Sequence, residues 1–296
     1  MEKIIFDCDN TMGVEGCDVD DGLALLYLLG KGNVEICGIT TTFGNSDLDT
    51  VYSATQGLLN DIGATHIPLL KGCPDKHTLT SKAAEFIVRT VNAYKKNISL
   101  LATGSLTNIY AAYLLDNSIF ENISRIVLMG GVTQELIING KKLNELNFSC
   151  DPAAAQCVLK NGKNVSVITG NNCLDAFFTK KDFEERLLAT DNASAKYIVN
   201  KCLYWFKNMM SIFNINGFHN WDVVAAAYVT EPSLFNDNLH YITPDLTNLE
   251  TGLLSLDSED AFPCQINLPT IDSLEKFTED VYKAWLNVNK GENFSW

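Results

Sequence analysis

Residues 4–26, IIFDCDNTMGVEGCDVDDGLALL, combine a short apolar run, a dense group of acids and the start of a helical pattern. The apolar run ends at Asp7 and Asp9, and a Gly-containing stretch then leads to Asp20 and Asp21 directly before LALL. In parallel α/β sheets, a buried strand runs into a helix and ligands bind beyond the carboxyl ends of the strands. This stretch therefore predicts the fold class, and it also predicts that the functional site lies at the carboxyl edge of the sheet.

The rest of the chain repeats the same alternation of buried strand and amphipathic helix. Further strand-like runs are VEICGIT at 34–40, ISLLAT at 98–103, RIVLMGG at 125–131 and VSVITG at 165–170. Helical spacing of apolar residues occupies 20–32, 51–63, 81–97, 106–116 and 151–162. No Pro/Ser-rich linker or repeat interrupts the pattern before residue 290. We therefore expect one α/β domain over residues 1–296, with a mostly parallel, Rossmann-like open sheet, helices on both faces, and a largely helical segment at about 185–235.

The composition excludes several classes of protein. With 36 acidic against 22 basic residues, the net charge of −14 disfavours a nucleic-acid partner, since phosphate contacts need clustered Lys and Arg. The nine cysteines are scattered without a CxxC pair, which argues against disulfides and zinc. The chain begins MEKIIFDCDN, which is not a signal peptide, and no apolar run reaches membrane-spanning length. We expect a protein of the cytoplasm with no membrane partner.

The acids near the N-terminus indicate a metal site. Asp7, Asp9, Asp18, Asp20 and Asp21 lie within fifteen residues, which exceeds what capping one helix requires. Gathered at one strand end, these carboxylates would repel one another unless a cation neutralised them. Oxygen ligands suit Ca²⁺ or Mg²⁺. The competing interpretation is a loop of solvated capping residues.

A second enzyme class shares part of this pattern. The segment FDCDNTM at 6–12 has the form of the aspartyl-phosphate loop of haloacid dehalogenase-type phosphatases, which would make Asp7 a nucleophile beside Mg²⁺. Those enzymes also need a later lysine and an acidic pair after another strand. Here the best such strand, RIVLMGG, ends in glycines.

Five segments taken in order resemble the inosine-uridine preferring nucleoside hydrolase family. They are DCD…VDDGLALL at 7–26, GITTTFGN at 38–45, LLATGSLTNI at 100–109, RIVLMGG at 125–131 with NELNFSCDPAAA at 144–155, and WDVVAAAY at 221–228. The resemblance implies the nucleoside hydrolase fold and Ca²⁺-dependent hydrolysis of the bond between ribose and a nucleobase. It also implies a homo-oligomer, either a dimer or a tetramer, and a ribonucleoside substrate.

The resemblance further implies a role for individual acids around the metal. Asp9 would bind Ca²⁺ and take a proton from the attacking water, and Asp21 would hold the metal through both oxygens. The backbone carbonyl of Thr103 and the carboxylate of Asp222 would complete the ligands, with Asp7 behind them. A metal that acidifies water, together with one carboxylate as general base, suits a reaction with an oxocarbenium-like transition state.

Other residues would bind the substrate if the family pattern holds. The expected contacts with ribose come from Asp20, Asn45, Met129, Asn139, Glu145 and Asn147, and Trp221 would contact the base. Taken singly, each has a plainer interpretation, such as a turn, a helix cap or core packing.

Three departures from the family pattern bear on activity and on the base. The stretch Thr11–Val19 is longer than usual, and the loop after residue 72 lacks the His-Gly-rich segment of many members, leaving residues 73–80 with His77. Trp221 stands where many members have a histidine that protonates the departing base. An indole can stack on a purine instead, so we expect purine nucleosides to be favoured.

The departures also leave alternatives open. His219 or His77 could still supply a proton, although each is expected to be structural. No second tryptophan is evident in the early loops to complete a sandwich. Four aromatic residues of a helical stretch could line the base pocket or belong to the core: Tyr204, Trp205, Phe206 and Phe213. A catalytically idle relative that binds nucleosides remains a further alternative.

Overall fold

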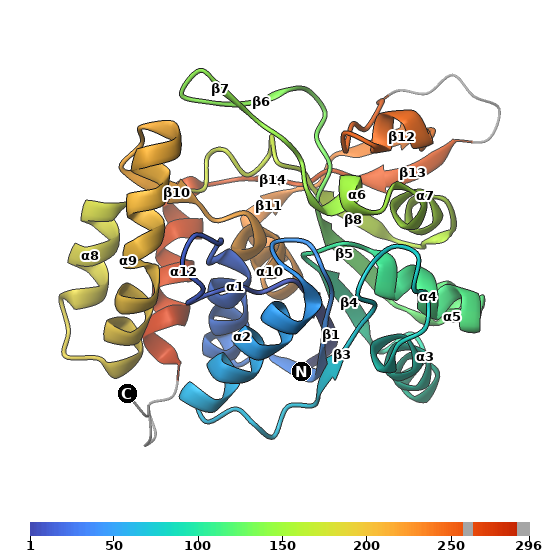
Figure 1. Ribbon diagram of the computed structural model, residues 1–296, viewed down its shortest axis with the longest axis horizontal. Coiled ribbons are helices and arrows are strands. Elements are labelled where there is room, and N and C mark those ends of the chain that lie inside the picture. Colours follow the sequence, from blue (N-terminus) through green and yellow to red (C-terminus); the bar gives the residue numbers. More distant parts are fainter. Residues whose placement is uncertain (257–262, 289–296) are drawn as a thin grey trace.

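The computed structural model describes residues 1–256 and 263–288. Its centre is an eight-stranded sheet (Figure 1). The strand order is β12 (Leu239–Ile242), β13 (Cys264–Asn267), β8 (Val165–Ile168), β5 (Arg125–Met129), β4 (Ser99–Ala102), β1 (Glu2–Cys8), β2 (Val34–Thr41) and β3 (Leu69–Lys71). Neighbouring strands are parallel except for the antiparallel pair β12 and β13. The predicted fold class, a mixed α/β domain with a mostly parallel sheet, is confirmed.

Helices cover both faces of this sheet (Figure 1). On one face lie α1 (Asp20–Lys31), α2 (Leu48–Asp61), α8 (Lys180–Leu188), α9 (Ala193–Phe213), α10 (Trp221–Thr230) and α12 (Leu274–Asn287). On the other lie α3 (Lys82–Tyr94), α4 (Thr107–Leu115), α5 (Ile119–Asn122), α6 (Asn147–Cys150), α7 (Pro152–Asn161) and α11 (Leu246–Leu249). None of the helices in the described residues is both long and apolar enough to cross a membrane.

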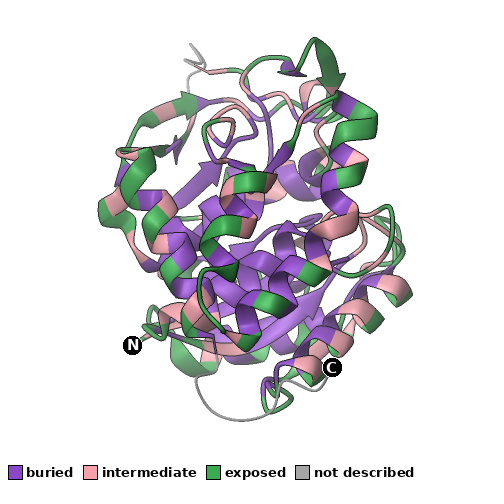
Figure 2. Cartoon of the chain, turned by 90° about the vertical axis from the view of Figure 1, so that its left-hand side faces the viewer, coloured by how far each residue is buried: buried purple, intermediate pink, exposed green. Residues whose placement is uncertain are grey.

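Two hydrophobic cores result, one on each face of the sheet. Successive side chains of a strand point to opposite faces, so Ile4 and Phe6 of β1 join the first core while Ile5 joins the second. All three are fully buried, which explains why the run IIF contains no polar residue. Figure 2 shows this buried interior surrounded by exposed outer helix faces.

Local sequence signals account for where the helices begin and end. The side chain of Asp47 caps α2 by accepting a hydrogen bond from the Thr50 N–H, so this helix begins three residues earlier than the apolar spacing predicts. Asp151 caps α7 in the same way, with Pro152 in the first turn. Asn214 ends α9 in the left-handed conformation at φ 55°.

Several short elements lie outside the main sheet. They are the hairpin β6 (Leu136–Ile138) and β7 (Lys141–Leu143), the pair β9 (Phe177–Thr179) and β10 (Gly217–His219), the 3₁₀ turn η1 (Pro232–Leu234), and the pair β11 (Phe235–Asn236) and β14 (Thr270–Ile271). The segment 185–235 thus contains the last four residues of α8, all of α9, β10, α10 and η1, and the first residue of β11.

The strand order also fixes the position of a crevice. From β1 the chain continues to β2 and β3 on one side, whereas β4 and β5 lie on the other side of β1. Such a reversal of strand order leaves a crevice beyond the carboxyl ends of the two central strands, which is where open α/β sheets bind ligands. Here these strands are β1, which leads to Asp9, and β4, which leads to Thr103.

Candidate active site

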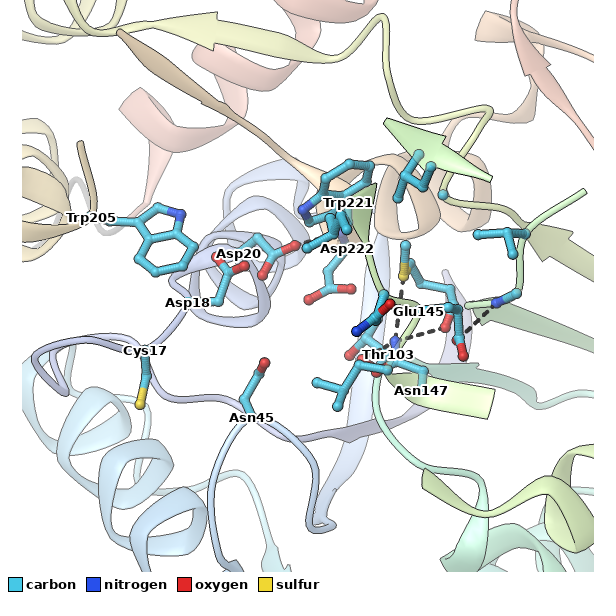
Figure 3. Close-up of a pocket in the computed structure, with 18 of the residues that line it drawn as sticks. Cys17, Asp18, Asp20, Asn45, Thr103, Glu145, Asn147, Trp205, Trp221 and Asp222 are labelled. Atoms are coloured by element: carbon cyan, nitrogen blue, oxygen red, sulfur yellow. Dashed lines mark hydrogen bonds between the residues drawn. The ribbon is translucent and has the colours of Figure 1, made fainter. Parts of the chain in front are cut away.

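A cavity of about 350 Å³ opens at this carboxyl edge. We call the part around Trp205 and Trp221 the aromatic end and the part around Asn45, Thr103 and Glu145 the acidic end. The two ends share residues, since Asp18 and Asp20 lie between the tryptophans and Asp222 lies next to Trp221 (Figure 3). The described residues that line it are Gly16, Cys17, Asp18, Asp20, Asn45, Thr103, Met129, Gly131, Val132, Leu136, Leu143, Asn144, Glu145, Leu146, Asn147, Gly170, Trp205, Trp221 and Asp222. Most of the predicted site residues are therefore brought together, from six different strand or helix ends.

Asp9 is fully buried just beyond β1 and is held on several sides. Its Oδ2 accepts the backbone N–H of Asn45 at 2.7 Å. Two glycines make room for its carboxylate: a Cβ at Gly44 would lie 1.9 Å from Oδ2, and one at Gly104 would lie 3.1 Å from the Asp9 Cγ. Burial raises the pKa of Asp9 to about 6. The loops after β2 and β4 thus position this carboxylate.

Asn45 and Thr103 connect Asp9 to Asp21. The side-chain amide of Asn45 donates to Asp9 Oδ1 at 3.3 Å and to Asp21 Oδ2 at 3.4 Å. The Thr103 hydroxyl donates to Asp21 Oδ1 at 2.6 Å, and its backbone N–H donates to the Asp7 carbonyl at 2.9 Å. The acids therefore share one hydrogen-bonded network.

Asp20, Asp21 and Asp222 form a compact group of carboxylates. One oxygen from each lies within 4.8 Å of the others, and the Asp222 N–H donates to Asp20 Oδ2 at 3.2 Å. All three are almost fully buried, and burial first, then mutual repulsion, raises the pKa values of Asp21 and Asp222 well above their usual range. Among residues 1–256 and 263–288, no Lys or Arg forms an ion pair with them. Oxygen-only donors that lack a cation fit a hard divalent metal ion.

Asp7 lies behind this group rather than in the cavity. Its Oδ2 accepts hydrogen bonds from the Thr40 hydroxyl and from the Asn108 side chain, the latter at 2.8 Å. Burial raises its pKa to about 7, and its Oδ1 is buried without a hydrogen-bond partner in the described part of the chain. Its expected role behind the metal ligands stays a prediction.

Asn147, the first residue of α6, lies beside Thr103 and Met129. Its side-chain amide donates to the carbonyl oxygens of Thr103 and Met129, both at 2.9 Å. A carbonyl oxygen has two lone pairs, so the Thr103 carbonyl retains one for a cation. Met129 ends β5 and lines the cavity beside Asn147.

Glu145 lines the cavity, but its carboxylate is also part of the loop structure. Oε1 accepts the N–H groups of Gly131 at 3.0 Å and Phe148 at 2.8 Å, and Oε2 accepts that of Ser149 at 2.9 Å. These bonds join the end of β5 to the first turn of α6. Any contact of Glu145 with a substrate would use its remaining lone pairs.

Asn139 is not brought to the cavity. It is exposed at the turn of the β6–β7 hairpin with φ 46°, and its amide donates to the Phe213 carbonyl at 2.8 Å. That bond attaches the hairpin to the end of α9. The sequence spacing could not reveal this competing partner.

Two tryptophans form the aromatic end of the cavity. Trp221 begins α10 directly before Asp222, and Trp205 lies on α9 with 9% of its surface exposed (Figure 3). Of the other aromatic residues considered from sequence, Phe206 packs edge-on against Phe183 in the core, and Phe213 is buried near the end of α9. Trp205 is the second tryptophan that the early loops lack.

His219 supports Trp221 instead of facing the cavity. Its ring lies 4.9 Å from the Trp221 ring and 5.0 Å from that of Phe177, centroid to centroid. Burial lowers the pKa of His219 to about 4, so its imidazole is neutral near pH 7. His77 is exposed in the loop after β3 and does not line the cavity.

Comparison with known proteins agrees with this geometry. The sequence pattern of the family described as "Inosine-uridine preferring nucleoside hydrolase" matches residues 4–281. The chain belongs to this family. It is therefore a nucleoside hydrolase, an enzyme that acts on ribonucleosides.

Relatives of this nucleoside hydrolase are distant but similar along most of their length. An inosine-uridine preferring nucleoside hydrolase of Crithidia fasciculata is 27% identical, with 93% of this chain and 95% of the relative covered. A probable uridine nucleosidase 2 of Oryza sativa subsp. japonica is 25% identical, covering 86% and 82%. A solved plant nucleoside hydrolase has a similar fold, with a TM-score of 0.85 over 96% of this chain and 99% of that chain at 20% identity.

Family membership removes the support for the phosphatase alternative. In this nucleoside hydrolase, β5 is followed by Gly130 and Gly131 at φ 158° and 70°, and the acidic pair of a phosphatase does not follow this strand. The backbone of these glycines packs against Phe148, where a Cβ would lie 2.7 to 3.0 Å from the ring.

Several residues that line the cavity were given no individual role from the sequence, Cys17 and Asp18 among them. Cys17 and Asp18 come from the long stretch Thr11–Val19, and both line the cavity. The unusual length of this stretch was the only signal in the sequence that it could reach the site. Whether it folds toward the cavity depends on tertiary contacts, which the sequence pattern does not reveal.

Proposed function

We propose that this enzyme uses bound Ca²⁺ to hydrolyse the N-glycosidic bond of ribonucleosides, giving ribose and free base, with purine nucleosides favoured. The single observation that carries the proposal is the lining of the cavity: buried carboxylates, without a protein counter-ion in the described part of the chain, lie beside two tryptophans. The carboxylates suit a metal and a sugar, and the tryptophans suit a flat nucleobase.

The residues that would hold the metal are Asp9, Asp21, Asp222 and the Thr103 carbonyl. Asp21 and Asp222 belong to the compact carboxylate group, and Asp9 is joined to Asp21 through the Asn45 amide. When bound, the cation would supply positive charge that makes an adjacent water more acidic. The choice of Ca²⁺ over Mg²⁺ rests on the family resemblance.

Asp9 is the proposed general base. Its carboxylate is held by the Asn45 backbone and is confined by Gly44 and Gly104, so its orientation is fixed. A base in this position would take the proton of the attacking water.

Asp20 and Asn45 are proposed to bind the 2′- and 3′-hydroxyl groups, with Asn147, Glu145 and Met129 around the rest of the ribose. The negative charge of this end would stabilise an oxocarbenium-like transition state. Asn139 could contact the ribose only if its side chain gave up the hydrogen bond to the Phe213 carbonyl at the end of α9.

The base preference follows from the aromatic end. Stacking of a base on an aromatic side chain contributes about 1–3 kcal/mol, and a bicyclic purine offers the larger face to Trp221 and Trp205. No histidine is among the described residues that line the cavity, so we propose that solvent protonates the departing base at a ring nitrogen.

A reducing-sugar assay tests this function. Calcium-loaded enzyme is given inosine, adenosine, guanosine, uridine and cytidine, and the assay is repeated with Asp9→Ala, Asp222→Ala and the exposed control Asp49→Ala. We expect ribose release, faster with purines, that both site substitutions abolish and the control leaves unchanged. Binding of nucleosides without ribose release would indicate the idle relative, and removal of metal by a chelator should stop turnover until Ca²⁺ is restored.

Two further properties stay predictions from the sequence. The family resemblance implies a dimer or tetramer, which light scattering on the purified enzyme would measure. The expected cytoplasmic location would be checked by fractionation of cells.

A further inference from the structure

The stretch Thr11–Val19 folds as a compact unit rather than an open loop. Val14 N–H donates to the Thr11 carbonyl at 2.9 Å, and Cys17 N–H donates to the Val14 carbonyl at 3.1 Å. The Thr11 hydroxyl donates to the Asp18 carbonyl at 2.9 Å, which ties the two ends together. These local bonds give the insertion a defined shape.

One hydrogen bond attaches this unit to a distant helix. The Gly13 N–H donates to the Tyr204 hydroxyl oxygen at 3.1 Å, across 191 residues of sequence. Gly13 has φ 93°, a conformation that other residues rarely adopt, and this conformation presents its N–H to α9. Met12 is buried beside Gly22 of α1, so the other side of the unit is packed too.

The attached unit and α9 both reach the cavity. Cys17 and Asp18 line it from the insertion, and Trp205 lines it from α9, next in sequence to Tyr204 (Figure 3). All three lie on the opposite side from the start of α10, where Trp221 lines the cavity. The Gly13–Tyr204 bond therefore joins the two segments that form the side of the cavity opposite Trp221.

We propose that Thr11–Val19 and α9 act as a single wall of the base subsite, and that Tyr204 is the positioning residue that holds this wall together. The inference rests on the proposed function, since it assigns the aromatic end to the base. A bicyclic base extends farther across the cavity than a monocyclic one, so it depends more on this wall. Tyr204 thereby contributes to the preference for purines without touching the substrate.

Removing the Tyr204 hydroxyl tests the inference. In Tyr204→Phe the insertion loses its bond to α9, and loss of one hydrogen bond corresponds to an increase of about threefold to tenfold in the KM for inosine. We expect kcat and the KM for uridine to change less than about twofold, because the acids at the other end are untouched. Gly13→Ala disfavours φ 93° and so disturbs the donor of the same hydrogen bond. This variant should show the same selective rise in the KM for inosine.

Tyr197→Phe is the matched control. Tyr197 lies two turns earlier on α9, and its hydroxyl donates to Asp61 at 2.9 Å rather than accepting a bond from the insertion. This variant should leave the ratio of the two KM values unchanged. Thermal unfolding of each variant shows whether the fold is retained.

Binding of C-nucleosides, whose carbon–carbon link to the sugar is not hydrolysed, separates the two proposals. Calorimetry should show weaker binding of a purine C-nucleoside, but not of a pyrimidine one, to Tyr204→Phe. Equal weakening for both, or the same change in Tyr197→Phe, would overturn the role of Tyr204 while leaving the hydrolase intact. A wild-type enzyme that neither cleaves nucleosides nor binds the C-nucleosides would overturn the proposed function and the inference together.

Discussion

The two ends of the cavity are built in different ways. At the acidic end, the carboxylates of Asp9 and Glu145 are held by backbone N–H groups, and Asn45 and Thr103 connect the acids. These residues follow directly on β1, β2 and β4 or lie close to β5. At the aromatic end, side chains come from an insertion and two helices, and ring contacts and one long-range hydrogen bond hold them.

This difference separates two demands on the enzyme. Proton transfer and metal binding require atoms to be placed within fractions of an ångström, which rigid strand ends and backbone hydrogen bonds provide. Stacking tolerates small displacements, because every base presents a π-face. We therefore expect changes at the acidic end to reduce kcat and changes at the aromatic end to raise KM in a base-dependent way.

The largest effect is expected from Gly44→Ala. The new Cβ would lie 1.9 Å from Asp9 Oδ2, so either the carboxylate or the Asn45 backbone must move. Misplacement of about 1 Å can cost on the order of 100-fold, and we expect a loss of kcat of about that size. Gly57→Ala is the control, because a Cβ at Gly57 meets nothing within 4 Å. Unaltered kcat in Gly44→Ala would show that the position of Asp9 does not limit the reaction.

A smaller, base-dependent effect is expected from Trp221→Ala. Loss of about 1–3 kcal/mol of stacking corresponds to a rise in KM of about fivefold to 150-fold for purine nucleosides. The KM for pyrimidine nucleosides should rise less, and Trp221→Phe should recover part of the affinity. Steady-state kinetics with inosine and uridine measure both. A uniform fall in kcat for both substrates would instead indicate that Trp221 acts in the chemical step, as the acidic residues are expected to do.

The acidic end could largely be predicted from sequence, because its side chains immediately follow apolar strands. Parallel strands place their carboxyl ends at one edge, so Asp9, Asn45 and Thr103 meet there whatever the details of the loops. The buried runs also identified β1, β2, β4, β5 and β8. The short strands β3, β12 and β13 carried too few apolar residues to be recognised.

The aromatic end could not be predicted, because it depends on contacts between distant segments. Trp205 has the helical spacing of a core residue, and only the packing of α9 shows that it also lines the cavity. Asn139 matched the family spacing, yet its amide binds the Phe213 carbonyl. The insertion is hydrogen-bonded through Gly13 to Tyr204, which lies 191 residues away.

The smallest expected effect concerns His219, which supports Trp221 from behind. Burial lowers its pKa to about 4, so below the ordinary value near 6.5 the unfolded chain binds a proton that the folded chain does not. The wild type should therefore lose stability as the pH falls through 6.5 toward 4, and above this window the effect should vanish.

His219→Phe keeps a ring beside Trp221 and removes the titrating group. Relative to this variant, the wild type should lose about 1 kcal/mol of unfolding free energy between pH 7 and pH 5, after allowance for partial exposure of the imidazole. Denaturant unfolding at both pH values measures the difference, with the exposed His77→Phe as control. If His219 donated a proton to the base, His219→Phe would also lower kcat sharply at pH 7. Retention of kcat together with the stability difference would assign His219 to holding the aromatic end in place, which is the role that its ring contacts predict.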